Sequence, residues 1–182
     1  MKKGLIITLL LSVILMGCST KGDIKTKEEE KQYFDFSHTE IVSKLEEYLI
    51  DFTDSGIVDG KEETEKIATY TSITDVFNAD KNNIDAMMHY LFTYDDLTEN
   101  VTRIHFFIDR NSTKSAERYL YHLDAMAESI EPNVNTDDIF TAIEKGFNNY
   151  DSAIYEGENF ELYASRNEEY FSASFTPIKK GE

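Results

Sequence analysis

Two neighbouring segments in which apolar and polar residues alternate place the strongest constraint on the fold of this chain. In residues 87–94 and 101–109, one set of alternate positions is almost wholly apolar. A period of two is typical of strands that bury one face. The polar stretch from Asp95 to Glu99 joins the two segments, which together predict an antiparallel hairpin. The positions on its apolar face are Met88, Tyr90, Phe92, Tyr94, Thr102, Ile104, Phe106 and Ile108.

Three other segments have apolar residues at spacings of three and four, which predict helices. The first begins at Ser37, which matches a capping box with Glu40. The second covers residues 114–131 and ends before Pro132, and the third covers residues 136–145 and ends at Gly146. The apolar stripe of the first helix consists of Ile41, Val42, Leu45, Tyr48, Leu49 and Phe52.

The order of these segments predicts the fold class. Residues 67–77 favour a further strand, and residues 160–165 and 170–176 favour a second hairpin. The chain therefore predicts an α+β fold in the order helix, antiparallel three-stranded meander, two helices, and a closing antiparallel hairpin or meander. A helix followed by a meander occurs twice, so tandem α/β units are an open alternative.

The first residues have the features of an export signal. Lys2 and Lys3 precede an apolar run from Leu5 to Leu15, which is too short for a helix that needs ~20 residues to cross a bilayer. The run ends in Leu15-Met16-Gly17-Cys18, and Cys18 is the only cysteine of the chain. This arrangement resembles the signal peptide and lipobox of bacterial lipoproteins.

The resemblance implies cleavage before Cys18 and a diacylglyceryl group on its thiol, which would anchor the chain in the bacterial cell membrane, facing outside the cytoplasm. Residues 1–17 are then the signal peptide. Residues 18–35 are the lipidated N-terminus and a flexible tether, because this polar stretch lacks apolar periodicity. Residues 36–182 are expected to form a single α+β extracytoplasmic domain.

The charge of the chain restricts its partners. With 35 acidic and 18 basic residues, the net charge is -17 at pH 7. A strongly acidic chain is unsuited to nucleic acid, whose phosphates require a basic surface. The expected partners are the membrane, through the lipid anchor, and a protein or envelope component.

The stretch after the first predicted helix offers oxygen ligands at the spacing of a calcium-binding EF-hand loop. Gly56 stands at the turn position of this loop, and Glu62 at its closing position. The alternative, which the sequence favours, is a glycine that stops the helix, followed by a turn at Asp59-Gly60. The candidate metal ligands are Asp51, Thr53, Ser55, Asp59 and Glu62.

A second candidate metal site consists of two histidines in the first hairpin. If the turn is centred on Leu97, His89 lies directly opposite His105, where two imidazoles could share a metal ion. Asp109 on the same face could add a third ligand.

The sequence favours binding over catalysis. It contains neither a nucleophile elbow nor a phosphate-binding glycine loop, and its one cysteine is assigned to the lipid. Exposed aromatic residues could bind a partner, with Tyr119, Tyr121, Tyr155, Tyr163 and Tyr170 as candidates. We therefore expect a non-enzymatic binding or accessory module without a cofactor. The alternatives are a calcium-binding or metal-responsive module that uses residues 51–62, and an envelope hydrolase of an unrecognised type.

Overall fold

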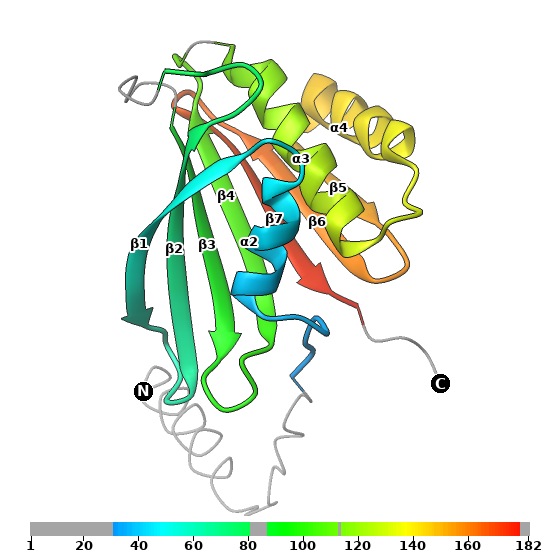
Figure 1. Ribbon diagram of the computed structural model, residues 1–182. Coiled ribbons are helices and arrows are strands. Elements are labelled where there is room, and N and C mark those ends of the chain that lie inside the picture. Colours follow the sequence, from blue (N-terminus) through cyan, green and yellow to red (C-terminus); the bar gives the residue numbers. More distant parts are fainter. Residues whose placement is uncertain (1–30, 81–86, 113, 179–182) are drawn as a thin grey trace, which may run out of the picture. The chain divides into compact units, whose positions relative to one another are not determined.

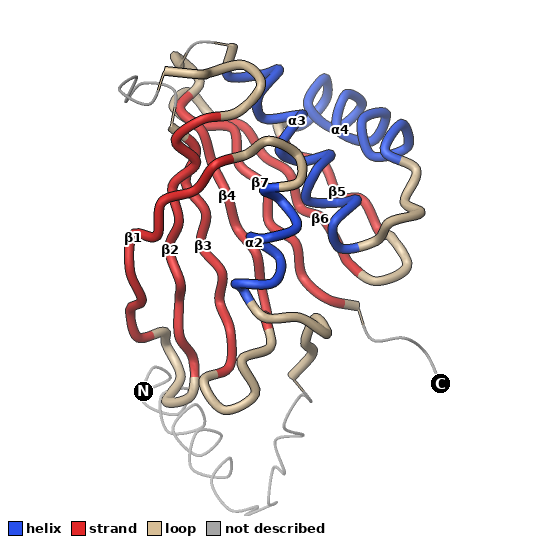
Figure 2. Tube along the Cα trace, viewed as in Figure 1, coloured by secondary structure: helices blue, strands red, loops and turns tan. Residues whose placement is uncertain are grey.

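A single antiparallel sheet of seven strands organises the folded part of the chain. The computed structural model describes residues 31–80, 87–112 and 114–178, and the compact unit to which they belong begins at Lys31. Figure 1 and Figure 2 show the sheet with three helices packed in front of it. The elements are α2 (His38–Glu46), β1 (Asp51–Asp59), β2 (Glu65–Thr74), β3 (Met88–Asp95), β4 (Val101–Asp109), α3 (Ser115–Ile130), α4 (Thr136–Tyr150), β5 (Ser152–Glu156), β6 (Phe160–Arg166) and β7 (Tyr170–Pro177).

The predicted balanced α+β fold with a three-stranded meander is wrong. The strand order is β1-β2-β3-β4-β7-β6-β5, and every neighbouring pair is antiparallel. Residues that the sequence assigned to a loop form the edge strand β1, which makes the first meander four-stranded. Pairing of β4 with β7 then joins this meander to the closing one. The result is one open sheet with three helices rather than two tandem units.

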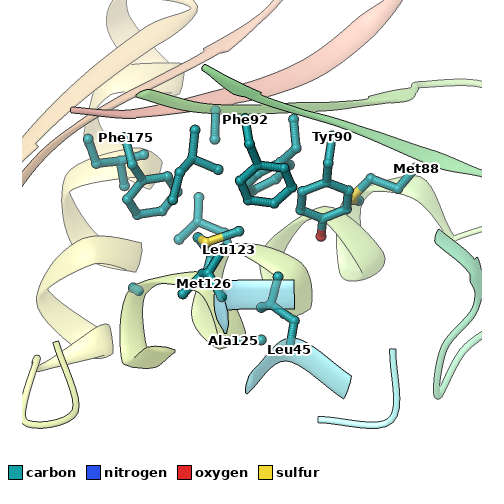
Figure 3. Packing of buried hydrophobic residues seen from close by; sticks show 14 of the residues in the cluster. Leu45, Met88, Tyr90, Phe92, Leu123, Ala125, Met126 and Phe175 are labelled. Carbon is teal, nitrogen blue, oxygen red and sulfur yellow. The ribbon is translucent and has the colours of Figure 1, made fainter. Parts of the chain in front are cut away.

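The alternation in the hairpin of β3 and β4 is confirmed by the core. Tyr90, Phe92 and Phe106 are buried on the side of the sheet that faces the helices. Figure 3 shows Tyr90, Phe92 and Phe175 pointing from the sheet towards Leu123 and Met126 of α3. All three helices contribute buried residues to this one cluster, so they cover the same face of the sheet.

Helix α2 begins as predicted and ends earlier. The Ser37 side chain accepts a hydrogen bond from Glu40 N, and Glu40 Oε2 accepts one from Ser37 N at 2.7 Å. The helix stops at Glu46, and Leu49 adopts a left-handed conformation with 70% of its surface exposed. The chain turns there into β1, which carries Phe52 out of the helical stripe.

The end of the predicted tether packs against the sheet. Phe34 is buried, stacks on Phe36 at 5.0 Å, and donates its backbone N–H to Val101 O at 2.8 Å. The remaining tether residues 18–30 and the predicted signal peptide lie outside the described residues.

Candidate protein-binding surface

The side of the sheet away from the helices carries a surface with few charges. Its residues alternate along the strands with the buried core positions, and all of them are half-buried or exposed. We call the outward side chains of the four central strands the open face. It consists of Ile67, Thr69, Thr71, Ile73, His89, Leu91, Thr93, Arg103, His105, Phe107, Asp109, Tyr170, Ser172, Ser174 and Thr176.

The open face differs in charge from the rest of the chain. Asp109 is the only carboxylate among these described residues, although the whole chain has 35 acidic residues. Glu65 and Asp95, which pair with each other at the ends of β2 and β3, also lie on this side. Their carboxylates are bound in the adjacent turns, where Glu65 accepts from Lys61 N at 2.6 Å and Asp95 accepts from Thr64 Oγ1 at 3.0 Å. The open face is therefore a nearly uncharged patch on an acidic protein.

Four rings cluster on the open face around Phe107. The Phe107 ring lies 5.2 Å from the His89 ring, 6.0 Å from the His105 ring and 5.6 Å from the Tyr170 ring. Tyr170 meets Phe107 edge-on, at an interplanar angle of 81°. The His89 and Tyr170 rings are exposed, while the His105 and Phe107 rings are half-buried. Accessible aromatic rings provide large, rigid contact areas for a partner.

A shallow hollow lies at the end of the ring cluster. Its volume is about 440 Å³, and its lining includes His89, Phe107, Asp109 and Tyr170. The Asp109 carboxylate is oriented by a hydrogen bond that it accepts from Asn111 N at 2.7 Å. The hollow thus combines an aromatic wall with a fixed negative charge.

The opposite end of β4 carries a positive charge. Arg103 is exposed there and forms no ion pair with any described residue. Burial lowers the pKa of the neighbouring His105, and the positive charge of Arg103 lowers it further. His105 is therefore neutral at pH 7, which leaves Arg103 as the cation among the outward side chains of β4.

The predicted register of the two candidate metal-binding histidines is wrong. His89 pairs with Phe107, and His105 pairs with Leu91. The turn is centred half a residue later than expected, because Asp95 N donates to Asn100 O, and a register irregularity at Thr93/Tyr94 shifts the pairing further. The two histidines share the open face diagonally, and within the described ranges no group of three His, Cys, Asp or Glu side chains could hold a metal ion.

The predicted calcium loop forms the exposed edge strand β1 and the turn that follows it. Asp51 accepts from Thr74 Oγ1 at 2.5 Å, Asp59 pairs with Lys66 at 2.6 Å, and Glu62 pairs with Lys31 at 2.5 Å. The Ser55 hydroxyl contacts Thr71 Oγ1 at 3.3 Å, and Thr53 is exposed opposite Thr71. The candidate ligands are thus distributed along a nine-residue strand and a turn, where most of them contact other side chains.

The aromatic candidates divide between the core and the surface. Tyr119 is buried and donates to Ser172 O at 2.8 Å, while Tyr121 and Tyr155 are half-buried on the helical side. Tyr163 and Tyr170 are exposed, with 47% and 38% of their surfaces accessible. Tyr170 belongs to the ring cluster, and Tyr163 extends the same side of the sheet across β6.

Comparison with known proteins gives no further information on this surface. No family model, curated protein or solved structure matches the chain. Cys18 lies outside the described residues, so its lipidation stays a prediction. Within the part of the chain that the structure describes, no helix is long and apolar enough to cross a membrane.

A buried polar network was not predicted from the sequence. Arg118 and His122 lie one turn apart on α3 and face the sheet, where both are fully buried. Asp75 Oδ2 accepts from Arg118 Nε at 2.7 Å and from His122 Nε2 at 2.8 Å. A carboxylate only accepts, so Nε2 of His122 carries the proton that it donates to Asp75. Nδ1 of the neutral ring then accepts a hydrogen bond from the Tyr90 hydroxyl. A polar pair spaced four residues apart within the apolar stripe was the signal available in the sequence.

The network anchors the segment that follows β2 to helix α3. Asp75 Oδ1 accepts from the backbone N–H groups of Phe77 and Asn78, both at 2.9 Å. Burial acts to raise the pKa of Asp75, but the hydrogen bonds from His122 and Arg118 outweigh it and lower the pKa. The carboxylate is therefore ionised and surrounded by donors, which suits a structural role.

Proposed function

We propose that this chain is a lipid-anchored extracytoplasmic binding module that acts without catalysis, and that its open face binds a protein partner. The observation that carries this proposal is the nearly uncharged open face with its ring cluster, on a chain of net charge -17. Protein interfaces are depleted of charged residues at their centre and enriched in Tyr, Phe and Arg.

The location of the titratable groups supports binding rather than catalysis. The Asp75, His122 and Tyr90 side chains are hydrogen-bonded in series, but all three are buried in the core between the sheet and α3. A catalytic group must lie within hydrogen-bond reach of its substrate. This network is directed at backbone N–H groups instead.

The lipid anchor is proposed from the sequence of residues 1–18. Chains of the full sequence, with Cys18 and with Cys18→Ala, are expressed in a bacterium and labelled with a fatty-acid analogue. We expect labelling and membrane retention of the first chain only. Equal labelling of both chains, or labelling of neither, would contradict the anchor.

The open face is tested by photo-crosslinking of the anchored chain. A crosslinking residue is placed at Thr93 on the open face, and in a separate chain at the exposed Glu144 on α4. We expect a discrete adduct from position 93 and none from position 144. The Phe107→Asp change, which introduces a charge into the ring cluster, should remove the adduct. Equal adduct patterns from the two positions would contradict the proposal.

A further inference from the structure

Strand β4 carries opposite charges at its two ends on the open face. Arg103 stands at one end and Asp109 at the other, about 20 Å apart at the usual rise of a strand. His105 and Phe107 lie between them on the same face. The pattern is self-complementary, because reversing the strand direction exchanges the positive end for the negative end.

From this pattern we infer that the open face packs against the open face of a second copy of this chain. The inference rests on the proposed function, since it names the partner of the same surface. The two-fold axis lies in the plane of the interface, perpendicular to the strands, and passes over β4 near Phe106. The two β4 strands therefore face each other in antiparallel directions. Arg103 of each copy then faces Asp109 of the other. In such an isologous contact, one patch must complement itself.

The hollow beside Phe107 provides a binding site for Arg103 of the second copy. Under the proposed symmetry, the guanidinium of the second copy enters the hollow lined by Phe107, Asp109 and Tyr170. Asp109 supplies the opposing charge, and the rings supply flat faces on which a guanidinium stacks. Arg103 has no ion-pair partner within the described part of its own chain, so it is available for this role.

The available area fits a stable dimer. At a strand spacing of ~4.8 Å and a rise of ~3.3 Å per residue, seven strands and seven residues of length give roughly 34 Å by 23 Å. Two such faces bury about 1,500 Å², within the range of about 1,200–2,000 Å² for specific interfaces. The four central strands of the open face alone give about 900 Å², so the contact must extend over the outer strands. On β5 and β6 the same side of the sheet carries Ile154 and Tyr163, together with Glu156 and Glu161.

Charge also selects this contact among the possible arrangements of two copies. A two-fold axis parallel to the strands would place Arg103 against Arg103. Pairing along the free edge of β1 is hindered by the irregularity at Gly56, whose φ is 117°, and by the exposed Asp54 and Asp59. Two acidic chains avoid repulsion best when their nearly uncharged central strands meet, which leaves Glu156 and Glu161 at the rim of the contact.

The test uses charge reversal in the full anchored chain, purified in detergent, with its mass measured by light scattering. Arg103→Asp and Asp109→Arg should each raise the dimer dissociation constant at least tenfold. The double variant should restore the affinity to within about threefold of the unaltered chain. An equimolar mixture of the two single variants should also dimerise, because each supplies the charge that the other lacks. Glu144→Arg, on the exposed side of α4, is the matched control and should have no effect.

Several outcomes would overturn the inference. The first is that the unaltered chain is monomeric at about 100 µM, and the second is that the single variants dimerise normally. The third is that the double variant and the mixture both stay monomeric although they retain the melting temperature of the unaltered chain. If the chain is monomeric and position 93 crosslinks to a different protein, the second copy is excluded and the proposed function stands. If positions 93 and 144 crosslink alike, the proposed function itself fails.

Discussion

Arg118 on α3 and Asp75, just after β2, form an ion pair in the interior of the protein. Nε of Arg118 lies 2.7 Å from Oδ2 of Asp75, and both side chains are fully buried. His122 donates to the same carboxylate oxygen. The pair therefore connects the helical layer to the end of a sheet strand through groups that have no contact with solvent.

Removing the charge of Asp75 should destabilise the fold severely. In Asp75→Asn, Arg118 keeps its positive charge in the core without a counter-ion, which typically costs about 3–5 kcal/mol. The free energy of unfolding, measured with urea, should fall by this amount. Asp96→Asn, in an exposed turn, is the matched control and should change it by less than about 0.5 kcal/mol. A loss below about 1 kcal/mol in Asp75→Asn would contradict the assigned role of the pair.

The stability of the protein should also decrease as the pH falls below 6.5. Burial lowers the pKa of His122, and the hydrogen bond with Asp75 only partly opposes this effect. The unfolded chain therefore binds a proton at His122 more readily than the folded chain does. The contribution of His122 is fully present above its unfolded pKa of about 6.5 and decreases by up to about 1.4 kcal/mol per pH unit below it.

The control for this pH dependence is the His122→Gln variant, because a glutamine side chain does not titrate. Urea unfolding between pH 7 and pH 5 should give a shallower loss of stability for the variant than for the unaltered chain. Parallel curves for the two proteins would show that His122 takes no part. The lowered pKa of Asp75 adds a separate loss at more acidic pH, below about 4.

Local patterns in the sequence predicted the elements whose structure depends on near neighbours. The capping box of Ser37 and Glu40 placed the start of α2, and the alternation in residues 87–94 and 101–109 placed the central hairpin. Strand β1 was missed because its sequence, rich in Asp, Ser and Gly, is typical of a loop. It becomes a strand through pairing with β2, a contact that local periodicity does not contain.

The candidate surface was only partly predictable for a similar reason. The alternation in β4 implied that His105 and Phe107 share a face, but it did not show that this face lies away from the three helices. The register depended on the irregularity near Tyr94, which has no clear sequence signal. Whether a tyrosine is buried, as Tyr119 is, or exposed, as Tyr170 is, depends on the packing of distant elements.

Calcium should leave the melting temperature of the protein unchanged. Calcium requires six to eight oxygen ligands at about 2.3–2.6 Å, whereas the oxygens of Asp51, Ser55 and Asp59 lie along a strand about 30 Å long. A site with a dissociation constant of ~0.1 mM would add ~1.4 kcal/mol at 1 mM calcium, a shift of a few degrees. A rise of this size over an EDTA control, absent in Asp51→Ala, would revive the calcium hypothesis.

Glu131, at the end of α3, should determine the stability of the turn between β5 and β6. Its Oε2 accepts from the backbone N–H groups of Glu158 and Asn159, both at 3.0 Å, and from Asn159 Nδ2 at 3.2 Å. Glu131→Ala leaves three donors without this acceptor and should lower the free energy of unfolding by about 1–3 kcal/mol. Glu131→Gln keeps an acceptor oxygen and should lose less than half of that amount.

Hydrogen exchange separates this local effect from a general loss of stability. In Glu131→Ala, the amides of Glu158 and Asn159 should exchange faster, while those of the β3 and β4 hairpin stay protected up to the global unfolding limit. Glu158→Ala is the control, because this residue lies in the same turn with an exposed side chain. If Glu131→Ala and Glu158→Ala exchange alike, the Glu131 carboxylate does not hold the turn, and the closing meander must be held by its strand pairing alone.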